Sequence, residues 1–329
     1  MARAWSLKSR PQGMPTMDNF ELVDLGRREL ADGEVRIANS WLSVDPYMRG
    51  RMNDVKSYTP PFELGKPMQG GAIGRVVESR SDRYREGDMV QHFAGWRDEA
   101  VLPADQVQPL PQLDVDPQAF LGQLGMPGMT AYFGLTEVAG LKEGDTVFVS
   151  AAAGAVGSTV VQIAKAKGCH VIGSAGGADK CAWVQSLGAD AVIDYKSGTP
   201  VVKALGEVAR NGIDVYFDNV GGEHLDAALA HANVHARFAI CGMIDVYNSA
   251  EPTSLRYLAR LIGNRVRMQG FIVSDYVGKA ADFYRDMGGW LGEGKLQRQE
   301  TVFDGLERAP DAFLALFSGG NTGKMLVRV

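Results

Sequence analysis

The segment from residue 146 to residue 168 constrains the fold more than any other, because it indicates a strand, a tight turn and a helix in succession. The turn, Ala151-Ala-Ala-Gly-Ala-Val-Gly157, is an A-x-x-G-x-x-G variant of the dinucleotide-binding fingerprint. Small residues let the backbone leave the strand sharply and approach a pyrophosphate, and the following helix offers unpaired N–H groups to that anion. A glycine-rich turn alone is weak evidence. Because a second apolar strand follows within about 30 residues, as the fingerprint requires, the sequence predicts nucleotide binding.

Strands and helices continue to alternate over the region 123–299. Its apolar runs lack polar alternation, which is typical of parallel strands covered by helices on both faces. Strands are expected at 146–151, 170–175, 191–195, 215–220, 237–242 and 266–273, and helices at 157–168, 178–188, 200–210, 222–232 and 252–262. The pattern predicts an α/β domain built on a parallel sheet.

The N-terminal third of the chain has a different pattern. Short apolar runs at 34–44, 71–79, 87–93 and 98–105 are separated by Gly, Pro and Asp. Such runs predict a small β-rich barrel or sandwich. The segment 301–329 predicts a strand, a helix and a final strand.

Composition excludes several classes of partner. The 329-residue chain carries a net charge of −5, which gives no support to a nucleic acid or an anionic membrane as partner. No apolar run approaches the roughly 20 residues that cross a bilayer, and the N-terminus lacks the apolar core of a signal peptide. We therefore expect a cytoplasmic protein with neither a nucleic-acid nor a membrane partner.

The metal-ligating residue types are scattered. Cys169, Cys181 and Cys241 show no C-x-x-C spacing, so they indicate neither a disulfide framework nor a structural zinc site. Among the histidines only His231 and His235 have an H-x-x-x-H spacing, and no Cys or Glu lies near them in the sequence. The sequence therefore predicts a protein without a metal site.

The end of the second strand discriminates between the two nicotinamide cofactors. An NAD site usually places an acid there for the ribose 2′-hydroxyl, whereas a 2′-phosphate needs a cation and no acid. This chain has Gly173-Ser-Ala-Gly-Gly177, followed by Lys180. Asp179 is close, but on the following helix it suits the N-terminal turn better. NADPH is therefore expected over NADH, although Lys180 could also be an ordinary solvated lysine.

Six motifs along the chain resemble those of one protein family. In order they are DPYMRGRM (45–52), GMPGMTAYFGL (125–135), SAAAGAVGS (150–158), FDNVGG (217–222), ICGMIDVYN (240–248) and GNTGKMLV (320–327). They resemble the zinc-free medium-chain dehydrogenase/reductase superfamily. The most similar branch is that of leukotriene B4 dehydrogenase/prostaglandin reductase, which includes plant alkenal double-bond reductases and bacterial curcumin reductases. The resemblance covers essentially the whole chain.

The resemblance implies a fold and an activity. A GroES-like, β-rich catalytic domain would span residues 1–122 and be completed by 300–329, and a Rossmann domain with a doubly wound parallel sheet would span 123–299. The activity would be the NADPH-dependent reduction of a carbon–carbon double bond conjugated to a carbonyl, without zinc. A homodimer is also implied, with the sheet edge near 265–275 as its interface.

The same resemblance assigns candidate site residues. The pyrophosphate would be held by Gly154, Ala155, Val156 and Gly157, the 2′-phosphate by Lys180 and Tyr195, and other parts of the cofactor by Asn219 and Asn321. The nicotinamide side would be lined by Cys241, Gly242, Met243, Ile244, Tyr247, Phe271, Ile272 and Val273. Tyr47, Met126 and Tyr247 would face the substrate, with Tyr247 as the catalytic group. Asp245 departs from the family, where a small polar residue is expected, and its place beside Tyr247 could alter the hydrogen bonding of that tyrosine.

The chemistry explains why tyrosine is a suitable residue. A conjugated enone accepts hydride at its β-carbon because the negative charge delocalises onto the carbonyl oxygen, where a neutral hydroxyl donor stabilises it.

Alternative interpretations remain open for both tyrosines and for the whole chain. Tyr247 could be a loop residue satisfied by the backbone, and Tyr47 could belong to an ordinary Asp-Pro turn. For the whole chain, the alternatives are a zinc-free NADPH quinone oxidoreductase and a nucleotide-binding protein with little catalysis.

Overall fold

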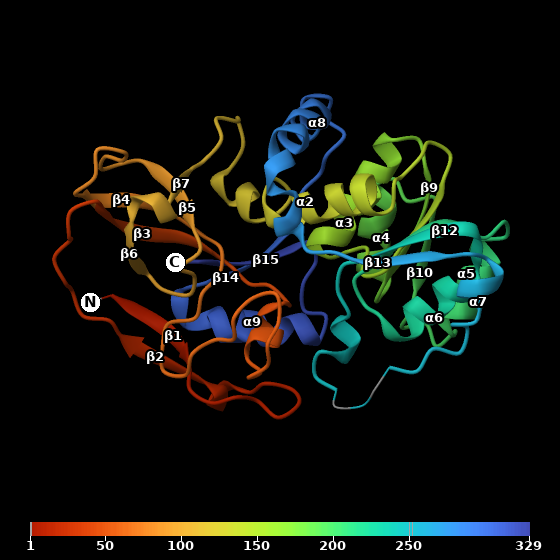
Figure 1. Ribbon diagram of the computed structural model, residues 1–329, viewed down its shortest axis with the longest axis horizontal. Helices are drawn as coiled ribbons and strands as arrows, with labels where there is room; N and C mark the ends of the chain where they lie inside the picture. Colours follow the sequence, from red (N-terminus) through yellow and green to blue (C-terminus); the bar gives the residue numbers. More distant parts are fainter. Residues whose placement is uncertain (1, 250, 252) are drawn as a thin grey trace. The chain divides into compact units, whose positions relative to one another are not determined.

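The computed structural model describes residues 2–249, 251 and 253–329, and the chain divides into two compact units (Figure 1). Unit 1 comprises Met1–Leu121, Glu300–Asn321 and Met325–Val329, and unit 2 comprises Gly122–Gln299 and Thr322–Lys324. Unit 1 is therefore discontinuous in sequence, because the chain leaves it for unit 2 and returns.

Unit 2 is built on a six-stranded parallel sheet. Its strands are β8 (Thr146–Val149), β9 (His170–Ala175), β10 (Ala191–Asp194), β11 (Ile213–Asp218), β12 (Ala232–Ile240) and β13 (Arg267–Gly270), in the spatial order β10-β9-β8-β11-β12-β13. The chain starts at β8, adds strands on one side as far as β10, then returns to β11 and adds strands on the other side. This reversal between β8 and β11 is the switch point of a doubly wound sheet, where such folds bind their ligands. The predicted α/β fold with a parallel Rossmann sheet is confirmed.

Helices cover both faces of this sheet. The helices of unit 2 are α2 (Met126–Phe133), α3 (Ala155–Ala166), α4 (Ala178–Ser186), α5 (Val201–Val208), α6 (Gly222–Ala230), α7 (Arg260–Gly263) and α8 (Ala280–Gly292). Ile172 of β9 lies in the core cluster that contains residues of α5 and α6, whereas its neighbour Gly173 faces Val184 of α4. Because successive residues of a strand point to opposite faces, α4 lies on the other face from α5 and α6.

One predicted helix of this region is wrong. A helix was expected at 252–262, but the structure has only the single turn α7 there, and residue 252 lies outside the described residues. Leu255, Tyr257 and Leu261 pack against the same core as α5 and α6 without forming a longer helix. The N–H of Tyr257 donates to Asp226 Oδ1 at 3.0 Å, so a side chain takes the hydrogen bond that a helix would make with its own backbone.

Unit 1 is a β-rich domain. Its sheet is mixed and contains β3 (Glu34–Ser43), β4 (Ala72–Ser79), β5 (Met89–His92), β6 (Glu99–Pro103), β7 (Gln108–Pro109), β14 (Glu300–Asp304) and β15 (Lys324–Arg328). All of its pairs are antiparallel except that of β14 with β15. A separate ribbon pairs β1 (Arg3–Leu7) with β2 (Phe20–Asp24), and the unit's helices are α1 (Met48–Arg51) and α9 (Ala309–Phe317). In its main core Phe20 stacks on Trp96, and Phe313 packs edge-to-face against both rings. The segment that follows unit 2 in sequence thus completes the core of unit 1.

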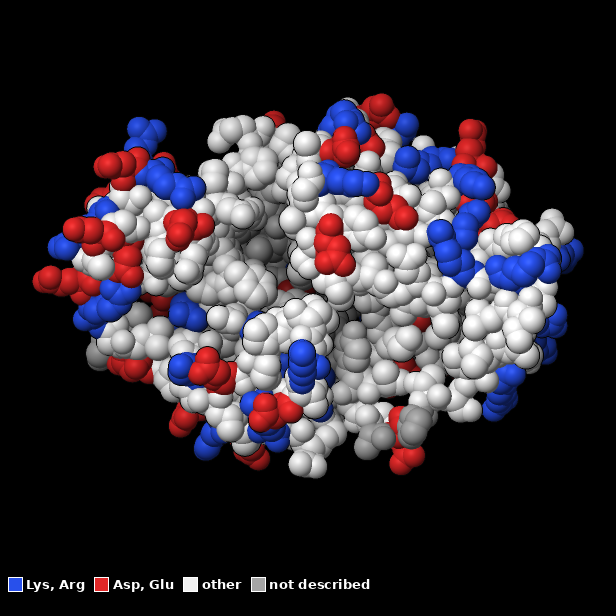
Figure 2. Space-filling model, in the orientation of Figure 1, with Lys and Arg blue, Asp and Glu red and all other residues white. Residues whose placement is uncertain are grey.

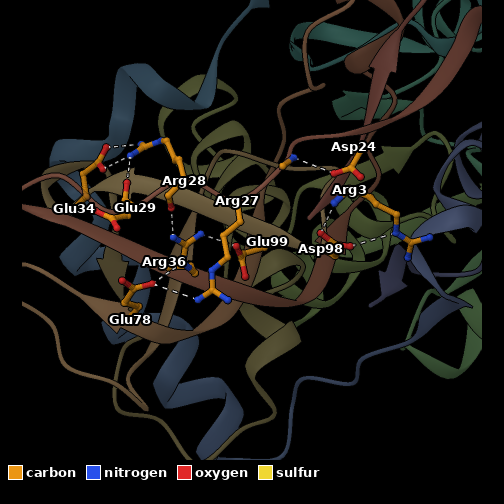
Figure 3. A network of polar contacts seen from close by, with 11 residues as sticks. Arg3, Asp24, Arg27, Arg28, Glu29, Glu34, Arg36, Glu78, Asp98 and Glu99 are labelled. Atoms are coloured by element: carbon orange, nitrogen blue, oxygen red, sulfur yellow. Dashed lines mark hydrogen bonds and ion pairs between the residues drawn. The ribbon is translucent and has the colours of Figure 1, made fainter. Parts of the chain in front are cut away.

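A network of charged side chains joins three strands of unit 1 (Figure 3). Arg36 on β3 is buried, and it donates to Glu78 of β4 at 2.8 Å and to Glu99 of β6 at 2.7 Å. Nearby, Arg28 forms two hydrogen bonds with Glu34, which lower the pKa of Glu34 to about 2. Contacts of this kind hold the neighbouring strands in register, and the two glutamates neutralise the buried positive charge of Arg36.

Figure 2 shows acidic and basic side chains intermixed over the visible face, without a continuous basic patch. Within the described part of the chain, none of the helices has the length and apolar character needed to cross a membrane.

Candidate active site

The residues predicted to bind the cofactor in unit 2 follow the carboxyl ends of its parallel strands. The turn 151–157 follows β8, Gly176 and Lys180 follow β9, and Tyr195 follows β10. Beyond the switch point, Asn219 follows β11, the loop 241–247 follows β12, and Phe271, Ile272 and Val273 follow β13. Because all of these strands run in the same direction, the structure brings the predicted residues to one edge of the sheet, where dinucleotides bind in such folds.

The turn after β8 is shaped for an approaching anion. Gly154 caps α3, which begins at Ala155, and no side chain caps the helix N-terminus. A Cβ atom on Gly157 would lie 2.3 Å from the carbonyl oxygen of Ala151, so the turn closes only around glycine. Ala151 itself adopts a φ of 47°. The uncapped N–H groups at the start of α3 suit a pyrophosphate, and the residues present therefore fit the predicted group.

The turn after β9 brings two lysines and a tyrosine together. A Cβ atom on Gly176 would lie 2.6 Å from Tyr195 Oη and 3.0 Å from Lys196 Cε, so both side chains lie against this glycine. Burial lowers the pKa of Lys180, and the positive charge of Lys196 lowers it further. The two ammonium groups therefore act on each other at the strand end where an NAD-binding protein usually has an acid.

The acid at the end of the neighbouring strand has a role within the protein. Asp194 ends β10, and its Oδ1 accepts hydrogen bonds from the backbone N–H groups of Gly177 and Lys196, both at 2.9 Å. These bonds lower the pKa of Asp194 and hold the two turns beside each other. The carboxylate is thus used within the protein, which is consistent with a site for a 2′-phosphate.

Asn219 is held by the end of β8. Its backbone N–H donates to Ser150 Oγ at 2.9 Å and its side-chain amide donates to the Ser150 carbonyl at 2.8 Å. Next to it, Asp218 accepts from Val220 N–H and Gly221 N–H through Oδ1, at 2.9 and 2.8 Å. The turn after β11 is therefore rigid, and the side chain of Asn219 has a fixed orientation.

The loop after β12 is tied to the turn after β11. The N–H groups of Cys241 and Gly242 both donate to the Asp218 carbonyl, at 2.9 and 3.0 Å, and Ile244 N–H donates to the Asn219 carbonyl at 3.3 Å. Burial raises the pKa of Cys241 to about 12, so its thiol is uncharged at neutral pH. The two loops that would line the nicotinamide side thus form one connected structure.

Tyr247 folds back onto this loop. Its Oη accepts a hydrogen bond from Met243 N–H at 3.3 Å and lies 3.0 Å from where a Cβ atom on Gly242 would be. Asp245 lies elsewhere, since its Oδ2 occupies the space where a Cβ atom on Gly222 would be, at the N-terminus of α6. The aspartate that departs from the family pattern therefore lies against the N-terminus of α6, a position that favours negative charge.

After β13, the ring of Phe271 packs against Phe217 of β11, with centroids 6.2 Å apart and an interplanar angle of 83°. A Cβ atom on Gly134 would clash with both rings, so this glycine allows the segment after α2 to approach the sheet. Ile272 and Val273 follow and are partly buried. The edge of the site is thus supported by aromatic packing.

Comparison with known proteins decides the family. A family model described as the N-terminal domain of oxidoreductase matches residues 3–110, and one described as zinc-binding dehydrogenase matches residues 155–288. NADPH-dependent curcumin reductase of Escherichia coli is 43% identical, over 99% of this chain and 96% of its own length. Prostaglandin reductase 1 of Bos taurus is 41% identical over 99% of both chains, and the 2-alkenal reductase of Nicotiana tabacum is 40% identical over 98% of this chain and 96% of its own. The chain belongs to the zinc-free medium-chain dehydrogenase/reductase family.

A solved structure of this reductase family has the same fold. CurA of Vibrio vulnificus in complex with NADPH superimposes with a TM-score of 0.94 at 43% identity, over 99% of each chain. The family and the Rossmann plus GroES-like fold expected from the sequence motifs are both confirmed. In the described residues, no group of three or more His, Cys, Asp or Glu is arranged to hold a metal ion.

Three predicted residues of this reductase lie outside the strand-end loops. Met126 begins α2 in unit 2 and is partly exposed. Tyr47 and Asn321 belong to unit 1. Asn321 immediately precedes Thr322–Lys324, which packs with unit 2 through the hydrogen bond from Gly323 N–H to the Ala153 carbonyl at 2.7 Å.

Two residues with clear places in the site were missed by the sequence reasoning. Lys196 directly follows the predicted Tyr195, so its position after the third strand could have identified it as a second cation. Asp218 ends β11 within the FDNVGG motif and connects the turn after β11 to the loop after β12. No sequence pattern distinguishes such a structural aspartate from a ligand of the cofactor.

Proposed function

We propose that this protein reduces the carbon–carbon double bond of α,β-unsaturated aldehydes and ketones with NADPH. It is an NADP-dependent oxidoreductase that acts on the CH–CH group of small-molecule conjugated carbonyl substrates. The observation that carries this proposal is the end of β9, where Lys196 lies against Gly176 and acts electrostatically on Lys180. It occurs in a chain about 40% identical to a named curcumin reductase and a named 2-alkenal reductase.

Unit 2 provides the NADPH site. Gly154, Ala155, Val156 and Gly157 hold the pyrophosphate through backbone N–H groups, and Lys180, Tyr195 and Lys196 hold the 2′-phosphate. Asn219 and Asn321 bind other parts of the cofactor. The nicotinamide side is lined by Cys241, Gly242, Met243, Ile244, Tyr247, Phe271, Ile272 and Val273.

Substrate is bound with help from Tyr47 and Met126, and Tyr247 is the catalytic group. The bound NADPH supplies the hydride that reaches the β-carbon. As that carbon is reduced, negative charge grows on the carbonyl oxygen, and the Tyr247 hydroxyl stabilises it by donating a hydrogen bond. The α-carbon then takes a proton, from Tyr247 or from water, to give the saturated product. In the loop contact with Met243 N–H the tyrosine oxygen is the acceptor.

The decisive experiment follows NADPH oxidation after a 2-alkenal or a quinone is added to the purified protein. The alkenal should be reduced, and NADPH carrying deuterium at C4 should deliver the label to the β-carbon of the product. Label on the carbonyl carbon would show an alcohol-forming carbonyl reductase. Reduction of quinone alone would identify a quinone oxidoreductase, and no oxidation with either would indicate a nucleotide-binding protein.

The setting of the protein is part of the proposal. We expect a cytoplasmic homodimer without a nucleic-acid or membrane partner. Support comes from the intermixed surface charge (Figure 2) and from β13, an edge strand whose residues are all exposed.

A further inference from the structure

The imidazole of His224 is buried near the carboxyl ends of three neighbouring strands of unit 2. His224 lies in the first turn of α6 and is 6% exposed. Its Nε2 is hydrogen-bonded to Oγ of Ser174 on β9 at 2.9 Å. Its ring stacks on Phe148 of β8, with centroids 6.5 Å apart and an interplanar angle of 13°. On its other side it meets the ring of Tyr195, which follows β10, in an edge-to-face arrangement at 5.5 Å and 82°.

His224 itself is not suited to bind a phosphate. Burial lowers the pKa of its imidazole to about 4, so the ring is uncharged at neutral pH. Its hydrogen bond with Ser174, which is fully buried, uses Nε2 inside the protein. A neutral, buried ring offers a phosphate no charge-assisted hydrogen bond. Any contribution of His224 to cofactor binding therefore acts through a neighbouring residue.

Tyr195 is the neighbour that belongs to the predicted cofactor site. Its phenol end lies against Gly176, where an added Cβ atom would be 2.6 Å from Oη and 2.7 Å from Cζ. The residue is 38% exposed, so protein atoms hold only part of it. A side chain that is ordered only when its ligand binds loses rotamer freedom at that moment, and this loss costs affinity. A ring that already packs against Tyr195 reduces this cost.

We propose that His224 positions Tyr195 in the 2′-phosphate subsite, and that this residue of α6 thereby contributes to the preference for NADPH over NADH. The inference rests on the proposed function, in which Tyr195 and Lys180 hold the 2′-phosphate of NADPH. It adds a residue from the other half of the doubly wound sheet, since α6 follows β11. The sequence around the phosphate-binding turns does not identify His224, because 50 residues separate it from Ser174.

The first test measures the binding of 2′,5′-ADP and of AMP to His224→Ala by calorimetry. The Kd for 2′,5′-ADP should rise roughly twofold to tenfold, the loss expected of one aromatic contact. The Kd for AMP, which lacks the 2′-phosphate, should not change. In steady-state assays KM for NADPH should rise while kcat keeps its wild-type value. An unchanged ratio of the two Kd values would overturn the inference.

His231→Ala is the matched control. His231 directly follows α6, and its Nε2 donates to the Val202 carbonyl at 2.7 Å, so this variant also removes a hydrogen-bonded imidazole beside the same helix. Its ring lies against Gly206 of α5. The ratio of the two Kd values should stay at its wild-type value. An equal change of the ratio in both variants would show that loosening of α6 causes the effect, and would overturn the inference.

A pair of variants of similar volume separates the aromatic contact from simple loss of packing. His224→Phe keeps a ring beside Tyr195 and should bind 2′,5′-ADP nearly as the wild type does. His224→Leu fills the space without a ring and should show the same rise in Kd as His224→Ala. If the alanine variant does not fold, this pair decides the question, and equal Kd values for the two would overturn the inference.

A double-mutant cycle with Tyr195→Ala tests whether His224 acts through that tyrosine. In the Tyr195→Ala background, His224→Ala should raise the Kd for 2′,5′-ADP no further. A further rise of the same size as in the wild-type background would overturn the inference and leave the proposed NADPH site standing. If Tyr195→Ala alone left the ratio of the two Kd values unchanged, the assignment of Tyr195 to the 2′-phosphate would fail, and the inference with it.

Discussion

At the scale of single residues, the preference for NADPH depends on charges gathered around Gly176. Lys180 is half-buried and close enough to the exposed Lys196 for that charge to lower its pKa, and Lys196 lies against Gly176 beside Tyr195. A half-buried cation binds a phosphate more strongly than an exposed one, because water and salt screen it less. The two lysines should therefore contribute unequally.

Lys180→Ala should raise the Kd for NADPH roughly tenfold to a hundredfold, the loss expected of a charge-assisted contact. Lys196→Gln should raise it by roughly twofold to fivefold, as for an exposed ion pair. Calorimetry with 2′,5′-ADP and with AMP isolates the contribution of the phosphate, and AMP binding should not change. Lys203→Gln, at an exposed position on α5, is the control. Equal weakening of both nucleotides would contradict the assignment.

Tyr247→Phe tests the catalytic hydroxyl. The ring and its packing remain, and only the donor is lost, so NADPH should bind with nearly wild-type affinity. Turnover should fall about a hundredfold, the effect of removing one oxyanion donor, or roughly tenfold if a second donor acts. Stopped-flow measurement of a single turnover separates the chemical step from product release. Wild-type turnover in the variant would mean that Tyr247 only shapes the loop through its contact with Met243.

At the scale of elements, the hydrophobic pattern predicted the strands and most helices of unit 2. It failed where a side chain takes a backbone hydrogen bond that a helix would need. Every expected strand from 146 to 273 has a counterpart in the sheet, because buried parallel strands are apolar throughout. The expected helix at 252–262 was wrong, since Asp226 takes the N–H of Tyr257 and no local pattern reveals so distant a partner. The site residues remain predictions, although the glycine turn was readable from its spacing. The position of Asp245 beside Gly222 at the start of α6 could not be predicted from the sequence, because α6 approaches Asp245 only in the folded chain.

The turn between β8 and α3 makes an element-level prediction. In Gly157→Ala the new methyl group would meet backbone atoms of Ala151 and Ala152 at 2.3 to 2.9 Å, so the helix start must move. Overpacking of this kind costs about 1–3 kcal/mol. At about 2–4 °C per kcal/mol, Tm should fall by several degrees, and NADPH should bind more weakly because the N–H groups lose their alignment.

Gly288→Ala in α8 is the control for this substitution, because its Cβ would meet nothing within 4 Å. Alanine favours a helix over glycine by roughly 0.5–1 kcal/mol, so this variant should keep or raise Tm. A Gly157→Ala protein with unchanged Tm and unchanged NADPH affinity would contradict the steric argument.

At the scale of the whole molecule, the parallel sheet of unit 2 ends in a strand that lacks a neighbour among the described residues. β13 follows β12 at the end of the strand order, and all four of its residues are exposed. Ile262 just before it is 84% exposed and Val277 after it is 61% exposed. An open strand edge with apolar side chains around it tends to pair with another chain. Two copies related by a twofold axis could join these edges.

Met268→Asp tests this interface. In a twofold contact each substitution occurs twice, so the variant would place two carboxylates near each other where two thioethers had been. Wild-type protein should have twice the 35.5 kDa mass of one chain by light scattering, and the variant should have the mass of the single chain. Val55→Asp, at a 57% exposed position of unit 1, should stay dimeric. A monomeric wild type, or a Met268→Asp protein that remains dimeric at low concentration, would refute pairing through β13. Because the residues proposed to hold the pyrophosphate and the 2′-phosphate follow β8, β9 and β10, away from β13 in the strand order, the monomeric variant should still bind NADPH.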